Sequence, residues 1–568
     1  MKNRLSGLFQ PKLFELFKKG NYSKELFTSD LIAGIIVGIV ALPLAIAFGI
    51  ASGVTPQQGL ITAVVAGFLV SFFGGSHFLI GGPTGAFIVI VYGIVAQYGM
   101  SGLIIATFLA GIILVLMGVL KIGGIIKFIP YPIVVGFTSG IAVVIFSTQI
   151  KDFFGLSIES VPSEFISQWG VYLTHFNTIN ITETVLSAAC LLMIIFWPKV
   201  SRKIPGSLIA IIVGTLAAVA LREFAGIEVA TIGTKFPELA GGITMPKPQL
   251  PELSISTIQA LIKPAFTIAL LCAIESLLAA MVADGVTGKK HNSNTELIGQ
   301  GIANIVTPFF GGIPATGAIA RTMTSINNGG KTPVTGIIHA VVLLLIFLFL
   351  MPYAVYIPLS CLAAILIIVA YNMSEWRTFK YLLKGDTTDV IILLITFSLT
   401  VIIDLTIAIE VGIGLAFLLF VRRISETSSI TISTDENIAN TESDELAMLA
   451  NIEQIDIPKG VEVYEIDGPF FFGLASKLDE VDRDLGKRNN KIRIIRMRKV
   501  PFMDSTGLHN LRSLVKRSQK EGIQIILSGV TQNVHNYFKK AGFDKEVGEE
   551  FIFSHISKAL KKAQELTK

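Results

Sequence analysis

The sequence predicts an α-helical, multispanning membrane protein that carries a small α/β domain at its C-terminal end. Of its 568 residues, 52% are apolar and only 15% are charged, which lies outside the range of soluble globular proteins. Apolar runs of about 20 residues, each long enough to cross a bilayer, recur from Leu31 to about Phe420. The modest net charge of +5, without a basic stripe that interleaves aromatic residues, gives no indication of nucleic-acid binding.

About 14 apolar segments are expected over residues 31–423, and some are too short to cross the bilayer unaided. Basic residues fix the direction of these segments, because Lys and Arg accumulate in cytoplasmic connections. Alternate connections do carry them, around residues 121–127, 199–203, 289–290 and 377–384. An even number of segments in the cell inner membrane, with both the N- and the C-terminus in the cytoplasm, satisfies this pattern.

Composition divides the chain into four parts. Residues 1–30 form a basic cytoplasmic segment and residues 31–423 the transmembrane domain. Residues 424–457 are polar and acidic, so they are expected to form a linker. Residues 458–568 alternate strand-like runs with amphipathic helical stretches that close on glycine, the pattern of one small α/β domain. The three cysteines lie in apolar segments and predict no disulfide or metal site, and nothing in the sequence indicates a cofactor or an enzyme.

Two stretches of the transmembrane part repeat one pattern. "FFGGSHFLIGGPTGAF" (residues 72–87) and "FFGGIPATGAIAR" (residues 309–321) both begin with Phe-Phe-Gly-Gly and then reach Thr-Gly-Ala. Non-helical backbone at membrane depth is tolerated only where protein buries it or where it lines a cavity. Each copy therefore predicts extended chain, a turn, and a half-helix that begins near Thr-Gly-Ala.

Interrupted segments at matching positions of two halves indicate an inverted-repeat transporter. The N-termini of the two half-helices would present free N–H groups and partial positive charge, which favours an anion. The small residues at these positions would let a ligand approach the backbone: Gly85, Ala86, Gly317 and Ala318. The alternative is that the small residues only allow helices to pack closely.

Two charged residues lie deep within apolar segments. Arg321 lies about one turn into the second half-helix, where its burial is costly, so it should face a cavity or a partner. It is either the fixed counter-charge to an anion or half of a structural ion pair. Glu275, in a long apolar helix, is either a proton carrier or a permanent partner of Arg321, because burial and a nearby arginine act on a carboxyl in opposite directions. Asp404 and Glu410 are weaker candidates at an external turn.

These motifs resemble those of the sulfate permease (SulP) family, which includes bacterial anion and bicarbonate transporters, animal anion exchangers and prestin. "LPLAIAFGIASGVTPQQGL" is similar to the family's first-helix signature and "GGPTGAF" to its third segment. "DGVTGKKHNSNTELIGQGIANI" and the following "FFGGIPATGAIARTMTSINNGGKTPVTG" are similar to its most specific block. "VPFMDSTGLHNL" is similar to the STAS domain that usually follows.

The resemblance runs from about Asp30 to the end of the chain. It implies a seven-plus-seven inverted repeat, a core domain that moves against a gate domain, and a homodimer. It also implies an anion site between the third and tenth segments, lined from the first helix. Carried over to this sequence, the site residues are Phe48, Thr84, Gly85, Ala86, Gly317, Ala318 and Arg321.

Two positions depart from the family pattern. Ala279 stands where sodium-using bicarbonate members have a threonine and offers no oxygen ligand, so protons rather than sodium are the expected coupling ion. Leu44 stands where many members have a glutamine, which weakens hydrogen bonding to the substrate from the first helix.

The expected function is proton-coupled, secondary active transport of an inorganic or small organic anion of the sulfate, bicarbonate or dicarboxylate class. Anion exchange and sodium-coupled bicarbonate transport are the alternatives, and the family motifs disfavour a nucleobase permease on the same fold. A membrane-anchored signalling protein is the rival class. Ser505 is relevant to this rival class. The residue is either a helix N-cap or, by resemblance to bacterial anti-sigma antagonists, a phosphorylation site. A regulatory protein or a nucleotide would then bind the STAS domain.

Overall fold

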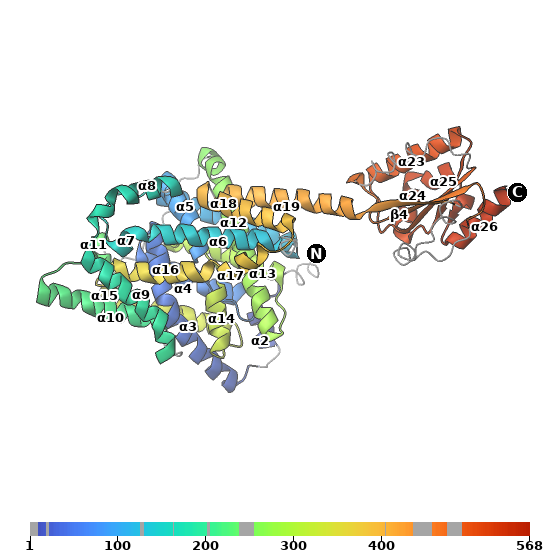
Figure 1. Cartoon of the computed structure of the whole chain (residues 1–568). Helices are drawn as coiled ribbons and strands as arrows, with labels where there is room; N and C mark the ends of the chain where they lie inside the picture. The colour runs from blue at the N-terminus through green and yellow to red at the C-terminus, as the bar shows by residue number, and fades with distance from the viewer. Residues whose placement is uncertain are drawn as a thin grey trace. The chain divides into compact units, whose positions relative to one another are not determined.

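The computed structural model describes residues 9–18, 22–124, 130–162, 164–201, 205–237, 255–403, 405–434, 457–473 and 491–567. The chain forms two units, Met1–Ile413 and Gly414–Lys568. The first is a bundle of long apolar helices, and the second contains a five-stranded sheet with its own helices (Figure 1).

Most of the first unit consists of helices that can cross a membrane. By length and composition, nine stretches of the described chain qualify. Their helices are α3 (Lys24–Ala51), α4 (Pro56–Phe73), η1 (Gly85–Phe87) with α5 (Ile88–Val119), α6 (Tyr131–Thr148) with α7 (Ile150–Phe154), α9 (Ile181–Val200), α10 (Gly206–Ala225), α12 (Ile255–Thr287), α15 (Val334–Ala354), and α16 (Leu359–Met373) with α17 (Trp376–Leu382). Other helices are α2 (Lys12–Lys18), α8 (Phe165–His175), α11 (Ile232–Lys235), α13 (Ser293–Val306), α14 (Ile319–Asn327), α18 (Thr387–Ile402) and α19 (Leu405–Thr427). The expected multispanning helical fold is confirmed, while the count of about 14 segments and the seven-plus-seven repeat stay predictions.

Local sequence sets where these helices begin and how closely they pack. Thr55 and Gln58 form a reciprocal capping box at the start of α4, and Pro56 occupies its first turn. Gly99 interrupts the long helix α5 with a positive φ of 67°, a backbone conformation that favours glycine. Gly59 brings α4 against α3, since a Cβ there would lie 2.1 Å from the carbonyl oxygen of Ala45. Small residues thus allow close helix contact, as is common in membranes.

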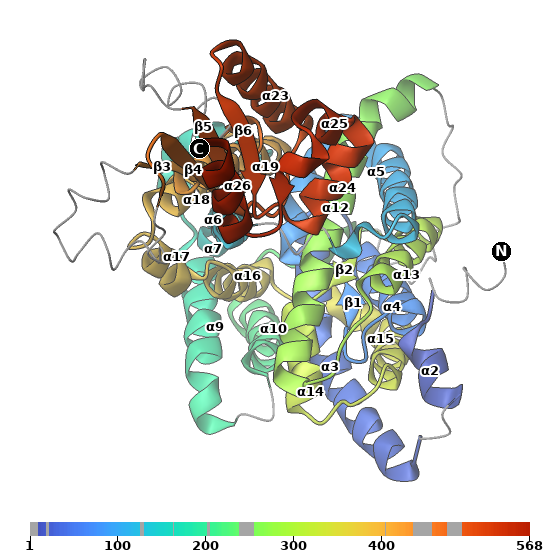
Figure 2. The ribbon, with the colours of Figure 1, turned by 90° about the vertical axis from the view of Figure 1, so that its right-hand side faces the viewer.

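The helices of the first unit exchange partners between its two halves. Helix α15, late in the sequence, packs against the early helices α3 and α4, whereas the early helix α5 packs against α12 and α13. Two short extended segments, β1 (Gly81–Gly82) and β2 (Thr316–Gly317), pair antiparallel between these groups (Figure 2). Helix α4 contacts β1 and α12 contacts β2. Residues far apart in the sequence therefore meet inside the helical unit, Gly82 opposite Thr316 and Gly81 opposite Gly317.

The second unit is an α/β domain with strand order β3-β4-β5-β6-β7. Its strands are β3 (Ser429–Thr434), β4 (Val461–Asp467), β5 (Ile492–Lys499), β6 (Gln524–Ser528) and β7 (Ile552–Phe553). From β4 onward the strands are parallel and carry buried residues on both faces, as expected for a covered parallel sheet. Helices α23 (Ser505–Lys520), α24 (Gln532–Ala541) and α25 (Phe543–Val547) share one apolar cluster with the sheet, and α26 (Ile556–Thr567) shares the other. The expected α/β domain is confirmed.

Strand β3 lies within residues 424–457, which the composition assigned to a linker. It pairs antiparallel with β4 over six residues, from Ser429 opposite Asp467 to Thr434 opposite Glu462. Its sequence, "SITIST", alternates isoleucine with small hydroxyl residues, and such a short, polar edge strand carries little hydrophobic signal. Part of the expected linker is therefore the edge of the sheet; residues 435–456 lie outside the described residues.

Two ion pairs on strands β4 and β5 test how burial changes the effect of a charge. Glu462 and Arg493 pair at 2.6 Å with almost no exposure, whereas Asp467 and Lys499 pair at the same distance in solvent. We expect Glu462→Ala to destabilise the domain by about 3–5 kcal/mol, because it removes the carboxylate that pairs with a buried arginine. Asp467→Ala should cost about 1 kcal/mol or less. Hydrogen exchange of the strand amides in the full-length protein measures both; equal effects would contradict the burial argument.

Candidate functional site

The two copies of the Phe-Phe-Gly-Gly pattern cross at the β1–β2 pair. Beyond it, the first copy turns at Pro83 and starts η1 at Gly85, while the second starts α14 at Ile319. Both copies therefore contain the expected extended chain followed by the start of a helix. The N-cap residues, Thr84 and Ala318, make no side-chain capping hydrogen bond. Both helices thus begin with backbone N–H groups that lack an intrahelical partner.

Arg321 lies against the backbone of the first copy. Its side chain is 2% exposed. Nη2 donates to the carbonyl oxygen of Pro83 at 2.8 Å, and Nη1 donates to that of Gly81 at 3.4 Å. Gly82 makes room for the guanidinium, because a Cβ there would lie 1.9 Å from Nη1. Among the described residues no carboxylate forms an ion pair with Arg321, so its charge is held by carbonyl dipoles.

Glu275 contacts the first copy through the side chain of Thr84, whereas Arg321 contacts its backbone. One carboxylate oxygen, Oε2, accepts a hydrogen bond from Thr84 Oγ1 at 3.0 Å. Both side chains are partly exposed, unlike that of Arg321. The expected alternative of a permanent Glu275–Arg321 pair is therefore wrong in this structure. Arg321 instead donates to two carbonyl groups of the extended chain, which have no partner within a helix.

Further polar side chains hold the extended segments and were missed by the sequence analysis. Asn304 of α13 makes two hydrogen bonds to the backbone of Ala315, at 2.8 and 2.9 Å. Glu296 accepts from the backbone N–H groups of Gly75 and Ser76 at 2.8 and 3.0 Å.

Ser276, next to Glu275, holds the second copy in the same way. Its Oγ accepts from the N–H of Gly317 at 3.1 Å and lies 2.6 Å from Oγ1 of Thr316. The polar residues within the apolar helices α12 and α13 were the signal from which these contacts could have been predicted. Their partners lie at least 11 residues away in sequence, which local patterns do not reveal.

The remaining residues expected at the site differ in how accessible they are. Ala318 is partly exposed, whereas Gly85 and Ala86 are buried, and Phe48 is 6% exposed on α3. A Cβ at Gly85 would lie 2.8 Å from Met373 Sδ of α16. Gly317 packs against Leu79, whose side chain would lie 2.5 Å from an added Cβ.

Candidate residues away from the crossing point have ordinary roles. Glu410 lies 3.7 Å from Lys263 in an exposed ion pair, and Asp404 lies outside the described residues. Ser505 is the exposed first residue of α23. It is not the N-cap, because Asp504 accepts the hydrogen bond from the N–H of Gly507 at 2.7 Å. Phosphorylation of Ser505 stays a prediction.

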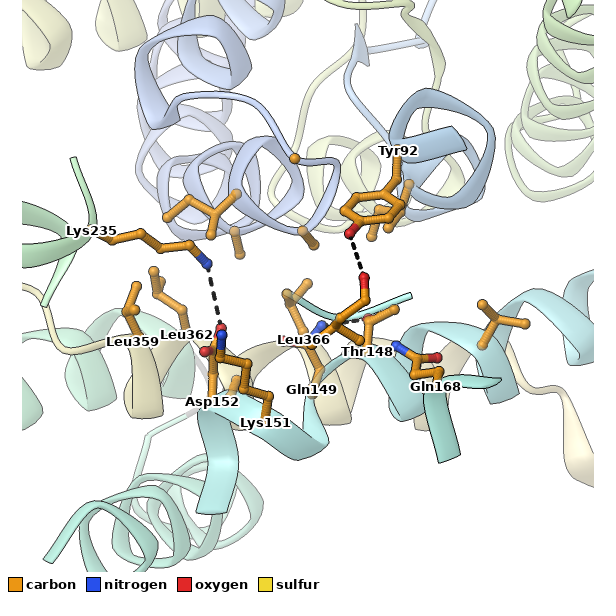
Figure 3. Close-up of a pocket in the computed structure, with 18 of the residues that line it drawn as sticks. Tyr92, Thr148, Gln149, Lys151, Asp152, Gln168, Lys235, Leu359, Leu362 and Leu366 are labelled. Carbon is orange, nitrogen blue, oxygen red and sulfur yellow. Dashed lines mark hydrogen bonds and ion pairs between the residues drawn. The ribbon is translucent and has the colours of Figure 1, made fainter. Parts of the chain in front are cut away.

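A cavity of about 460 Å³ lies beside the start of α5 (Figure 3). Its apolar wall includes Ala47 and Ile88, which are sequence neighbours of Phe48 and of the residues of η1. Its polar wall carries Lys235, which lies 3.8 Å from Asp152 in an ion pair. Tyr92 of α5 also lines it and donates to the carbonyl oxygen of Val161 at 3.0 Å. The cavity is thus lined by both apolar and charged side chains, and residues next to Phe48 and to η1 form part of its wall.

Two interrupted segments that meet inside a bundle of membrane-spanning helices are typical of secondary transporters. Residues 27–396 match the model of the sulfate permease family, and residues 454–562 match the STAS domain. The chain therefore belongs to the sulfate permease family, a family of membrane transporters, and carries a C-terminal STAS domain.

Relatives match this chain over nearly its whole length. YvdB of Bacillus subtilis, which bears a provisional sulfate-transporter name, is 42% identical over 534 residues, 94% of this chain and 97% of its own. The bicarbonate transporter BicA of Picosynechococcus is 30% identical over 94% of each chain. The solved transmembrane domain of a cyanobacterial BicA, 31% identical, covers 68% of this chain and 98% of its own with a TM-score of 0.63. Murine Slc26a9, 19% identical, shares the fold with a TM-score of 0.87 over 99% of this chain and 95% of its own.

Gly82→Ala tests whether the crossing point depends on the contact with Arg321. The added methyl would displace the guanidinium from two carbonyl groups, and hydrogen bonds to charged groups each contribute about 1.5–3 kcal/mol. We expect a clearly lower apparent melting temperature of the detergent-solubilised protein. Gly99→Ala in α5 is the matched control, because Gly99 also has a positive φ and a Cβ there meets no atom within 4 Å. A melting temperature of Gly82→Ala equal to that of the control would show that the contact is dispensable.

Proposed function

We propose that this chain is a secondary active transporter of a small anion of the sulfate, bicarbonate or dicarboxylate class. The observation that carries the proposal is the meeting of two uncapped helix starts beside a buried arginine, which has no carboxylate partner in the described part of the chain. The names of its relatives, a sulfate transporter and a bicarbonate transporter, support this class of substrate. Uptake by proteoliposomes, with sulfate, bicarbonate, chloride and succinate as competitors, would identify the anion.

Arg321 acts on the anion through the backbone. The carbonyl oxygens of Gly81 and Pro83 carry partial negative charge close to the helix starts and would repel an anion. Arg321 donates to both oxygens and so neutralises them. The partial positive charge of the N–H groups at Gly85 and Ile319 then dominates the site. In this arrangement the guanidinium is a fixed charge behind the site, and the backbone makes the direct contacts.

Thr84 couples the anion site to Glu275. A charged Glu275 only accepts hydrogen bonds, so it engages the hydroxyl proton of Thr84. An anion arriving beside Thr84 places a second negative charge near the carboxylate, which favours protonation of Glu275. The neutral acid then releases the hydroxyl of Thr84 to donate to the anion. Anion and proton would thus enter together. Ala279, buried on the same helix, offers no oxygen to sodium.

Transport would proceed by movement of a core against a gate. The proposed core contains α3 to α5 and α12 to α15, and the proposed gate contains α6, α9, α10, α16, α18 and α19. The close approach of Gly85 in the core to Met373 and Ile145 in the gate supports this division, as does a cavity lined from α3, α5, α6 and α16. We further propose a homodimer in the cell inner membrane with cytoplasmic termini, in which the STAS domain binds a regulator and tunes the rate.

Substitution of Arg321 tests the anion site. We expect Arg321→Ala to lower anion uptake into proteoliposomes about ten-fold or more, because two charge-assisted hydrogen bonds are lost. Arg321→Lys should retain partial activity, since it restores the charge without the two-pronged geometry. Arg222→Ala, at the exposed end of α10, is the control. Wild-type uptake by correctly inserted Arg321→Ala would refute the assignment.

Substitution of Glu275 tests proton coupling. Wild-type uptake should rise as the external pH is lowered and should not change when sodium is replaced by potassium. Glu275→Gln resembles the protonated acid, so we expect it to bind or exchange the anion but to lose the response to external pH. Thr84→Val should weaken anion binding. The control is Glu410→Gln, which removes only an exposed carboxylate. Sodium-dependent uptake, or an unchanged pH response in Glu275→Gln, would leave Glu275 with a structural role.

A further inference from the structure

A second pocket lies at the other end of the first spanning helix, where α3 begins. Its volume is about 290 Å³. It is lined by Glu15, Leu16, Leu26, His77, Lys289, Lys331 and Thr332. These residues come from α2, the start of α3, the segment before β1, and the connections that follow α12 and α14. The pocket is separate from the crossing point, and neither the resemblance nor the proposed transport mechanism uses it.

The cations of this pocket outnumber the carboxylates that reach them. Glu15 pairs with Lys12 at 2.7 Å. Lys289 lies 5.0 Å above the centre of the Phe78 ring, and its Nζ donates to the backbone oxygen of Lys331 at 3.3 Å. In the described residues, Lys289 and Lys331 have no carboxylate within ion-pair distance. Two like charges are therefore held side by side.

Asp30 is close to these lysines but is occupied by other donors. It is fully buried and accepts from the N–H groups of Lys331 and Thr332 and from the hydroxyl groups of Thr332 and Thr335. These bonds hold residues 330–335 against the start of α3. The carboxylate thus positions the lysine-bearing connection without entering the pocket.

His77 is a neutral side chain in the wall of this pocket. Its pKa is lowered to about 4, first by burial and then by the charges of Lys289 and Lys12. The imidazole is therefore neutral at pH 7. Among the described residues its Nδ1 has no hydrogen-bond partner. The pocket thus combines two lysine charges with a neutral histidine, and the lysine charges suit a phosphate group.

The surroundings of the pocket favour a phosphate that belongs to a lipid. Helix α2 carries the exposed aromatic residues Phe14 and Phe17 beside its lysines, and Phe27 is exposed next to the pocket residue Leu26. Such an amphipathic helix is typical of the membrane interface. The 28 residues of α3 span about 42 Å, more than the roughly 30 Å of hydrocarbon, so one end of α3 lies at headgroup level.

We propose that this pocket binds the phosphate headgroup of an anionic phospholipid, with Lys289 and Lys331 as the charged contacts. The acyl chains would lie along the exposed aromatic residues of α2 and α3. Basic pockets between transmembrane helices on the cytoplasmic side bind anionic headgroups by the same physical means. The lipid would hold α2 and the connection after α14 against the start of α3. It would thereby stabilise the N-terminal end of this helix, which carries Phe48 near its other end.

Native mass spectrometry of the full-length protein in neutral detergent tests this site. Phosphatidylglycerol and phosphatidylcholine with identical acyl chains are added in equal amounts. We expect the wild type to retain phosphatidylglycerol with about ten-fold preference, since each lysine near a headgroup contributes several-fold. The double variant Lys289→Gln/Lys331→Gln should reduce the preference below about three-fold. Both lysines are exposed, so their removal should not disturb folding.

Lys290→Gln is the matched control, because Lys290 is an exposed sequence neighbour that does not line the pocket. It should keep the wild-type preference. Equal retention of both lipids by the wild type would overturn the proposal. So would an equal loss in Lys290→Gln, which would indicate diffuse surface charge. Displacement of phosphatidylglycerol by inorganic phosphate or glycerol phosphate would assign the pocket to a soluble anion instead of a lipid.

Discussion

Backbone hydrogen bonding at the crossing of β1 and β2 is the constraint on which the transmembrane unit depends. Extended chain inside an apolar bundle leaves N–H and C=O groups without hydrogen bonds, because the bilayer core contains no water that could bind them. The short β1–β2 pair satisfies only some of them. Side chains satisfy others: Arg321 donates to two carbonyl groups, Asn304 makes two hydrogen bonds to the backbone of Ala315, and Ser276 accepts from the N–H of Gly317. Arg321, Asn304 and Ser276 are therefore buried polar residues that the extended backbone at this crossing requires.

The same constraint separates the two deep charges. Arg321 donates to carbonyl groups of the first copy, whereas Glu275 accepts a hydrogen bond from Thr84 at the edge of the site. A buried ion pair would have cancelled both charges and left the helix starts without a fixed positive charge behind them. Instead the arginine lies against carbonyl groups of the first copy, and the carboxylate stays partly exposed beside a hydroxyl. This separation provides the proposed mechanism with one group for the anion and another for the proton.

Hydrogen-bonded carboxylates also organise the periphery of the unit. Asp30 joins the start of α3 to the connection after α14, two regions about 300 residues apart, and Glu296 joins α13 to the segment before β1. Each is fully buried and accepts several hydrogen bonds. A removed carboxylate would leave several buried donors unsatisfied at once, which is costly. The lysines near Asp30 are thereby held next to one another, although their charges repel.

The sequence by itself determined the fold class, the presence of a C-terminal α/β domain, and the two broken segments with their half-helices. Hydropathy, strand alternation and the positions of Gly and Pro are local properties, so one chain is sufficient to read them. The tertiary structure alone decided the partners of Glu275, Arg321 and Asn304, and it showed that strand β3 edges the sheet. A hydrogen bond depends on which distant segments meet and on which donors are already used, and neither follows from the spacing of residues along the chain.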